Sequence, residues 1–513
     1  MSGIVLSASV RQNLLSLQST AALLATTQND LATGNKVNSA LDNPTEYFTA
    51  QSLNNRASDI SNLLDGIGNG VQVLQAANTG ITSLQSLIAN AQSIANQVLQ
   101  APTGYSTKSN VSSSTLTGAT ATNLLNATSS NVTGTVVKND NTTSVAIGNT
   151  TLLSGTGGSS SNDLATGITT GDTLVVNGTT FTFIAGSAST GTNIGITDNV
   201  SDLLATIATA TGVSGSLSGG AITFTPTTAG LTLSGTALGK LGLTTQGDSL
   251  AGQTLTITAT GGGTQTSLTF GLGTGQISTL NQLNTALAAN NLQATITNGQ
   301  LNIVTTNDAA SSTIGTLGGT SVSATGGAFN GVSAAAAAVA DPNSQATRAS
   351  LVAQYNNVLS QINTTAQDSS FNGVNLLNGD TLKLVFNETG KSTLSITGVT
   401  FNQSGLGLST LTAGTDFLDN NSANKALTLL STASSTLRSE ASTLGSNLSI
   451  VQIRQDFNKN LINVLQTGSS NLTLADTNEE AANSQALSTR QSIAVSALAL
   501  ANQSQASVLP LLR

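Results

Sequence analysis

The chain has 513 residues, more than one hydrophobic core usually holds, so we expect several domains. Only 7% of the residues are charged, the formal net charge at pH 7 is −8, and the lysines and arginines are scattered, which argues against nucleic-acid binding. The absence of cysteine and histidine excludes disulfides, thiolate metal sites, the zincin motif and Ser-His-Asp catalysis.

The first predicted element is a heptad helix that ends near Gly34. Apolar residues recur at steps of four and three, and only Gln28 interrupts the seam. Residues 1–10 lack a cationic start and a long apolar run, so no signal peptide is predicted, and no stretch is long enough to span a membrane. The residues of this helix that we predict to form an assembly interface are Val10, Leu14, Leu17, Ala21, Leu24 and Leu31.

A second and longer helix is predicted from position 43 to Pro102. Asn43, Pro44 and Glu46 have the pattern of an N-cap, a first-turn proline and a capping-box acid. Without an internal proline, the helix spans about 80 Å at 1.5 Å per residue. Its heptad frame predicts rod packing by Leu53, Ile60, Leu64, Ile67, Val71 and Leu74, and a second apolar seam predicts more than one neighbour.

The composition changes after Pro102 to threonine, serine, glycine and asparagine, and the hydrophobic period becomes alternating. A pattern of strand, strand, helix, strand begins at Thr173 and is repeated from Thr254. We therefore expect two small α+β modules, at about 171–245 and 250–325, within an inserted region 103–341. Their inward helix faces are predicted to be Leu203, Leu204 and Ile207 in the first copy, and Leu283 and Leu287 in the second.

Helical periodicity returns at Asp341 and Pro342, which predict the start of another helix. The stretch SSFNGVNLLNG then predicts a turn in which Asn372 and Gly373 adopt positive φ. The segments TLKLVF and STLSITGV, joined through 387–390, predict a β-hairpin.

The last rod helix is predicted to run from about Ser422 to Gln466. We expect Gly468, Ser469 and Ser470 to separate it from the terminal helix. Its predicted packing residues are Leu437, Leu444, Leu448 and Val451.

The carboxyl-terminal helix is predicted to start at Asp476, which can cap it with Glu479 three residues on. Its apolar stripe is too narrow to bury itself, so we expect it to pair with the first helix. The residues predicted at its assembly interface are Ala486, Ile493, Ala497, Leu498, Leu500, Val508, Leu509, Leu511 and Leu512.

Two stretches carry a family resemblance. LATGNKVNSALDNP near the start and LALANQSQASVLPLLR at the end resemble the terminal signatures of bacterial flagellin. The resemblance implies a mainly α fold, with a long coiled-coil-like helical rod from both chain termini, a β-hairpin, and an inserted β or α+β outer region. The implied parts are filament-core segments 1–42 and 467–513, rod segments 43–102 and 342–466, and the insert 103–341. An insert between two rod helices, rather than after the hairpin, departs from the commonest flagellin layout.

The same resemblance implies a non-enzymatic subunit that polymerises through its terminal helices into the flagellar filament and serves motility. Implied partners are further copies in a helical homopolymer, the flagellar export apparatus with its chaperone, and hook-associated junction and cap proteins. The implied location is extracellular, after export without a signal peptide, and no cofactor, metal, nucleic acid or membrane is expected. Two alternatives stay open, namely a hook-filament junction protein and a surface adhesin displayed by the insert.

A further implication concerns the flagellin-sensing Toll-like receptor of animal innate immunity. Flagellins that it detects resemble QRVRELAVQ on the long rod helix, where arginines make charge-assisted hydrogen bonds. The matching stretch here is ANAQSIANQ, with Asn90 and Gln92 near the arginine positions and no basic residue between Arg56 and Lys108. We therefore expect weak or absent recognition.

Overall fold

The computed structural model describes residues 8–141, 143–155, 162–187, 190–227, 230–247, 250–332 and 334–508, with the side chains of 505–508 left out. Within these ranges, no helix has the length and apolarity that a membrane crossing requires. The chain forms two compact units. The first consists of Met1–Leu87, Ser360–Gly407 and Ala433–Arg513, and the second of Ile88–Leu359 and Leu408–Thr432.

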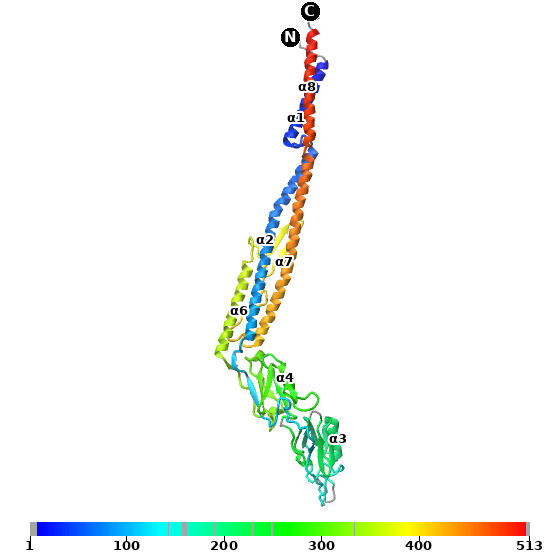
Figure 1. Ribbon diagram of the computed structural model, residues 1–513, viewed down its shortest axis with the longest axis vertical. Coiled ribbons are helices and arrows are strands. Elements are labelled where there is room, and N and C mark those ends of the chain that lie inside the picture. The colour runs from blue at the N-terminus through cyan, green and yellow to red at the C-terminus, as the bar shows by residue number, and fades with distance from the viewer. Residues whose placement is uncertain are drawn as a thin grey trace. The chain divides into compact units, whose positions relative to one another are not determined.

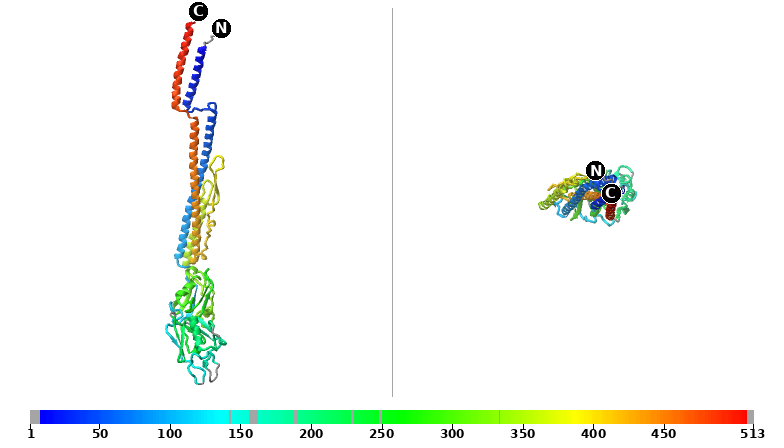
Figure 2. Two further views of the ribbon diagram at one scale, coloured as in Figure 1. Left: turned by 90° about the vertical axis from the view of Figure 1, so that its right-hand side faces the viewer. Right: turned by 90° about the horizontal axis from the view of Figure 1, so that it is seen from above.

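Five long helices confirm the predicted α-helical character of both chain ends. They are α1 (Ala8–Thr33), α2 (Pro44–Gln100), α6 (Pro342–Asp368), α7 (Asn420–Thr473) and α8 (Thr477–Val508). The predicted N-caps form: the Asn43 side chain accepts from the Glu46 N–H at 3.2 Å, and the Asp476 carboxylate accepts from the Asn478 N–H at 3.0 Å. Within the first unit, α2 and α7 lie side by side (Figures 1 and 2).

Most of the predicted rod-packing residues on α2 and α7 are buried. Ile60, Ile67, Val71 and Leu74 of α2 are buried, as are Leu437, Leu444 and Val451 of α7. Leu53, Leu64 and Leu448 are half-buried. Near the end of α7, Leu465 forms a buried cluster with Ala57 and Ile60.

The predicted end of the last rod helix at Gln466 is wrong, because α7 continues through Gly468–Ser470 to Thr473. These small residues pack rather than break the helix. The Ser469 hydroxyl is buried and donates to the Ala50 carbonyl at 3.1 Å, so α7 approaches the backbone of α2 there. The helical hydrogen bonds stop only at the bend before α8.

The predicted hairpin is confirmed as β16 (Thr381–Val385) paired antiparallel with β17 (Thr393–Thr397). The turn before it also has the predicted backbone, with φ of 49° at Asn372 and 79° at Gly373. The hairpin packs on the rod helices of the first unit. A Cβ at Gly70 of α2 would collide with the Leu384 side chain, and the Asn458 amide of α7 donates to the Phe386 carbonyl at 3.0 Å.

The central region is β-rich, as predicted, and its entry and exit strands pair with each other. β1 (Tyr105–Thr107) lies antiparallel to β15 (Val339–Ala340). The second copy of the repeat, called here the second module, contains β2 (Asn110–Thr115), β10 (Thr254–Ile257), β11 (Thr266–Thr269), α4 (Leu280–Ala288), β12 (Leu292–Thr297), β13 (Gln300–Thr305), β14 (Leu317–Gly318) and α5 (Thr320–Ser323). A 3₁₀ turn, η2, covers Asn307–Ala309.

The first copy, called the first module, has the same plan. It contains β3 (Val132–Thr133), β4 (Thr173–Val176), β5 (Thr179–Ile184), β6 (Asn193–Gly195), α3 (Val200–Thr211), β7 (Ser214–Ser218), β8 (Ala221–Thr225), β9 (Leu233–Ser234) and the 3₁₀ turn η1 (Gly239–Leu241). Its sheets are ordered β6-β5-β4-β9 and β3-β8-β7, which correspond to β11-β10-β14 and β2-β13-β12 in the second module.

The predicted order of strand, strand, helix, strand is therefore incomplete. Each module has a second hairpin after its helix, and the sheet of that hairpin gains a strand from an earlier part of the chain. Because β7 has the sequence SGSLS, it lacks the alternating large apolar residues that identify a strand. The chain enters the second module with β2, builds the whole first module, and returns to complete the second.

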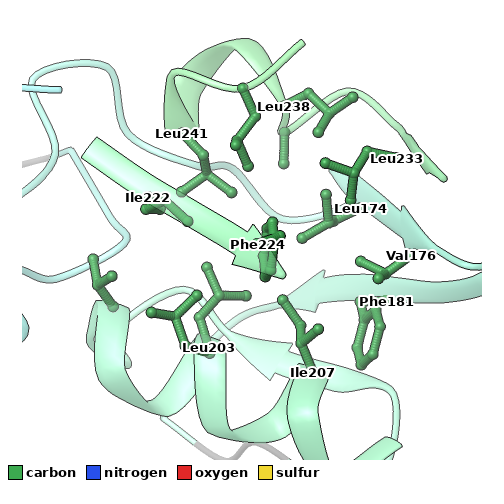
Figure 3. Packing of buried hydrophobic residues seen from close by; sticks show 14 of the residues in the cluster. Leu174, Val176, Phe181, Leu203, Ile207, Ile222, Phe224, Leu233, Leu238 and Leu241 are labelled. Carbon is green, nitrogen blue, oxygen red and sulfur yellow. The ribbon is translucent and has the colours of Figure 1, made fainter. Parts of the chain in front are cut away.

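The helix of each module covers its sheets with the predicted apolar face. Leu203, Leu204 and Ile207 are buried in the first module, and Leu283 and Leu287 in the second. Figure 3 shows Leu203 and Ile207 pointing toward Phe224 of β8 and the side chains of β4 and β5. Both helices start with a complete capping box, at Asn199 and Thr279.

Candidate assembly surface

The helices α1 and α8 form an antiparallel pair, in which the amino-terminal end of α1 lies beside the carboxyl-terminal end of α8 (Figure 2). Backbone hydrogen bonds fix the other end of the pair. The Lys36 N–H donates to the Thr473 carbonyl at 2.7 Å, and the Ala475 N–H donates to the Gly34 carbonyl at 3.0 Å. The bend after α7 therefore places α8 against α1.

The face of α1 that packs against α8 differs in part from the predicted seam. Val10 and Leu24 are buried, and Leu17 and Ala21 are half-buried, but Leu14 and Leu31 are each 38% exposed.

Thr20, Thr27 and Asp30 are buried in their place. Hydrophobicity could not identify these positions, because all three side chains are polar. The Thr20 hydroxyl can be buried because it donates to the Ser16 carbonyl of its own helix at 2.8 Å. Burial and the nearby Asp42 raise the pKa of Asp30, while a hydrogen bond from the Asn38 amide opposes this rise.

The predicted pairing seam of α8 is wrong in its heptad frame. Ala486, Ile493, Ala497 and Leu500 are exposed, and of the predicted residues whose side chains are described only Leu498 is half-buried. The half-buried row has uninterrupted heptad spacing and consists of Glu480, Ser484, Leu487, Gln491, Ala494, Leu498 and Ala501. Polar and small residues occupy most of this row. The prediction relied on hydrophobicity and therefore placed the seam on the neighbouring, more apolar face of the helix. Leu509, Leu511, Leu512 and the Val508 side chain lie outside the described residues.

As a result, the helix pair carries large apolar side chains on its outer surface. Leu15 is 63% exposed and Leu23 is 52% exposed on α1, and Ile493 is 64% and Leu500 69% exposed on α8. A two-helix pair has no third element to cover these faces. Exposed apolar surface of this extent marks sites of protein-protein interaction.

A second exposed apolar row runs along α7. Ile450, Ile453, Phe457 and Val464 are all exposed, and they share one heptad frame. This row faces away from the buried residues Leu444 and Val451, so it contributes to the surface and not to the rod core.

Arg348 of α6 is a structural residue that the sequence did not indicate. Its side chain is fully buried in the second unit, and it donates to four backbone carbonyls. The acceptors are Pro102 at 2.6 Å, Phe417 at 2.5 Å, Ala101 at 2.9 Å and Val98 at 3.1 Å.

The position of Arg348 couples three segments where the insert begins and ends. Val98 and Ala101 lie at the carboxyl end of α2, where carbonyls have no intrahelical partner, so a cation is favoured there. Burial lowers the pKa of Arg348, while the nearby Asp419 carboxylate acts in the opposite direction. Tyr355 and Phe417 pack edge to face, with ring centroids 5.7 Å apart. Arg348 and its four carbonyl acceptors are called the Arg348 clamp below.

Side chains suited to metal binding do not gather in the described part of the chain, where no group of three or more Asp and Glu residues could hold an ion. The arrangement that stands out in the described residues is a set of exposed apolar helix faces.

Comparison with known proteins agrees with this arrangement. Residues 6–133 match the family model of the bacterial flagellin N-terminal helical region, and residues 427–512 match that of the C-terminal helical region. The chain thus has both terminal helical regions of bacterial flagellins, in the same order. The resemblance inferred from the terminal signatures is thereby confirmed.

Similar flagellins occur in Caulobacter vibrioides. Flagellin FljM is 34% identical over 165 residues, and flagellins FljO and FljK are each 32% identical over 165 residues. Each alignment covers 32% of this chain and 59% of the relative, so the chain spans about three fifths of the length of the relatives it matches.

Proposed function

We propose that this chain is a structural subunit that polymerises through its terminal helices into the bacterial flagellar filament and serves motility. The observation that carries the proposal is the exposed apolar surface of the α1–α8 pair. Fully burying a leucine or isoleucine contributes about 1.5–3 kcal/mol. Leu15, Leu23, Ile493 and Leu500 together therefore favour association by an amount on the order of 5 kcal/mol.

The exposed row on α7 supports a second contact between neighbouring subunits. The relatives named above are flagellins, which supports a filament subunit over a junction protein or an adhesin. On this proposal the chain acts outside the cell, in a helical homopolymer of itself. Its other partners are the flagellar export apparatus with its chaperone, and hook-associated junction and cap proteins.

A single charge on the outer face of α8 tests the proposal. Ile493→Asp should leave the monomer folded, because Ile493 is already 64% exposed, but should prevent polymerisation by placing an unpaired charge in the interface. Asn478→Asp is the matched control, since it adds the same charge to the first turn of α8, where the helix dipole favours it. Electron microscopy of sheared and reassembled filaments gives the readout. Normal filaments from Ile493→Asp would reject the proposed interface.

The insert is expected to be dispensable for polymerisation. β1 and β15 hold its two ends together, with Tyr105 paired to Ala340, so a short linker can replace everything between them. Replacing residues 111–338 with a short Gly/Ser linker should give thinner filaments, as seen by electron microscopy. Circular dichroism shows whether the rod remains helical. Failure to polymerise with a helical rod would contradict this expectation.

Recognition by the flagellin-sensing Toll-like receptor is expected to be weak or absent. Asn90 is exposed on α2 and Gln92 is half-buried, and no lysine or arginine follows Arg56 on this helix. Losing a buried charged contact costs roughly 2–5 kcal/mol, or about thirtyfold or more in affinity.

A receptor-reporter cell assay with purified monomer measures this recognition. Asn90→Arg combined with Gln92→Arg should increase signalling, whereas a pair of arginines with the same spacing at Ser52 and Asn54, both exposed on α2, should not. Wild-type potency equal to that of a strongly detected flagellin would contradict the expectation.

A further inference from the structure

The two modules of the insert differ at one edge of their sheets. In each module the first strand of the second hairpin is an edge strand beside the helix, β7 beside α3 and β12 beside α4. Both hairpins have a two-residue turn with positive φ, Gly219–Gly220 in the first and Asn298–Gly299 in the second. The turns fix the same register, so Ser218 corresponds to Thr297, and Gly215 corresponds to Ala294.

This register decides which backbone groups face outward. In an antiparallel hairpin, hydrogen-bonded and non-hydrogen-bonded pairs alternate along the strands. Counting from Ser218, which pairs with Ala221 across the turn, the non-hydrogen-bonded positions of β7 are Leu217 and Gly215. Their N–H and C=O groups therefore point away from β8, toward the open edge.

In the second module the corresponding edge is closed by a side chain. The Asn284 amide of α4 donates to the Ala294 carbonyl at 3.1 Å, and its oxygen accepts from the Ala294 N–H at 2.6 Å. Asn284 is the fifth residue after the N-cap Thr279, and the fifth residue after the N-cap Asn199 of α3 is Leu204.

In the first module the edge is open. Leu204 packs directly on Gly215, where an added Cβ would collide with it, but a leucine side chain cannot form hydrogen bonds with the backbone. Among the described residues, the outward groups of Gly215 and Leu217 have no hydrogen-bond partner. A groove between α3 and β7 follows this edge, and its lining includes Ser201, Ala205 and Ser216.

Proteins normally protect an edge strand with lysine, proline, a bulge or a covering segment. β7 has none of these, and the groove beside it is lined by uncharged residues although the chain carries a formal net charge of −8. A second copy can therefore approach without charge repulsion at this point. The strand sequence SGSLS is also nearly symmetric about Ser216.

We propose that the β7 edge is a self-association surface, at which the β7 strands of two copies pair antiparallel about a two-fold axis at Ser216. In this register Gly215 of each copy pairs with Leu217 of the other, so both outward residues are satisfied and four backbone hydrogen bonds form. The two Ser216 residues face each other as a non-hydrogen-bonded pair, in which small side chains allow close approach. A helical polymer repeats head-to-tail contacts, so this two-fold contact is an interface additional to the terminal helices and independent of them.

A single introduced cysteine tests the proposal, because the natural chain has none. Facing residues of a non-hydrogen-bonded pair have Cα atoms about 4.5 Å apart, within the range that a disulfide requires. Ser216→Cys in the full chain should form disulfide-linked dimers under mild oxidation. Thr295→Cys is the matched control, at the corresponding exposed position on the closed edge of β12. Non-reducing gel electrophoresis should show dimerisation at least about tenfold faster for Ser216→Cys.

Two further variants distinguish edge pairing from random collision. Leu204→Asn, which introduces the closing residue of the second module, should lower the Ser216→Cys rate to that of the control. Ser214→Lys combined with Ser218→Lys should do the same without altering the core, because both residues are exposed and the symmetric register places the lysines opposite each other.

Adding Ile493→Asp to every variant separates this test from polymerisation by the terminal helices. Equal dimerisation of Ser216→Cys and Thr295→Cys would overturn the proposal. So would a disulfide that forms only in a mixture of these two variants, since β7 would then pair with β12 of the neighbour.

Discussion

A chain that ends before Ala475 is expected to form no filaments. Without α8, the residues Val10, Leu17 and Leu24 of α1 lose the surface that they pack against. Ordering the backbone costs about 1–2 kcal/mol per residue, and most of the stability of a helix in a protein comes from the packing of its apolar face. Loss of α8 therefore removes both the outward row at Ile493 and Leu500 and the support for α1.

Electron microscopy and sedimentation of the purified truncated chain measure this outcome. Circular dichroism provides the control, because α2, α6 and most of α7 should stay helical. Folding of the α1–α8 pair should also be coupled to assembly, so its amide hydrogens should exchange faster in monomers than in filaments. Filaments of normal appearance from the truncated chain would contradict the prediction.

Replacing Arg348 with methionine is expected to lower the free energy of unfolding of the second unit by about 3–5 kcal/mol. The change leaves four carbonyls without their donors, at Val98, Ala101, Pro102 and Phe417. Arg348→Lys should recover only part of this loss, because an ammonium group lacks the planar set of five donors.

Urea unfolding monitored by circular dichroism measures the effect. Arg438→Met is the matched control, since it removes the same charge from an exposed position on α7. Equal urea midpoints for Arg348→Met and Arg438→Met would show that the Arg348 clamp contributes little to the free energy of unfolding. A loss confined to the transition of the second unit would support it.

The long helices and their starts could be predicted because they depend on local chemistry. Asn43 and Asp476 cap their helices through their own side chains, and the heptad rows of α2 and α7 are apolar enough to identify the rod core. The β16–β17 hairpin and the positive φ at Asn372 depend on equally local signals.

The features that the sequence did not indicate depend on contacts between distant segments. The heptad frame of α8 was wrong because its inner row holds Glu480, Ser484 and Gln491, and only the tertiary structure selects that row. Nothing in the sequence around Arg348 reveals four carbonyls brought together from two other segments. The small residues Gly468 and Ser469 act as helix packing contacts for the same reason.

The nested order of the modules has a consequence for the kinetics of folding. Ser112 on β2 and Asn302 on β13 form a side-chain hydrogen bond although they are 190 residues apart in the chain. A chain that emerges amino terminus first therefore presents β2 long before its partner strand exists. The first module lies wholly within this interval and has a core of its own, so it can fold first. Its folding then brings residues near Thr128 and Leu231 together, which shortens the loop that β2 and β13 must close and lowers the entropic barrier to completing the second module.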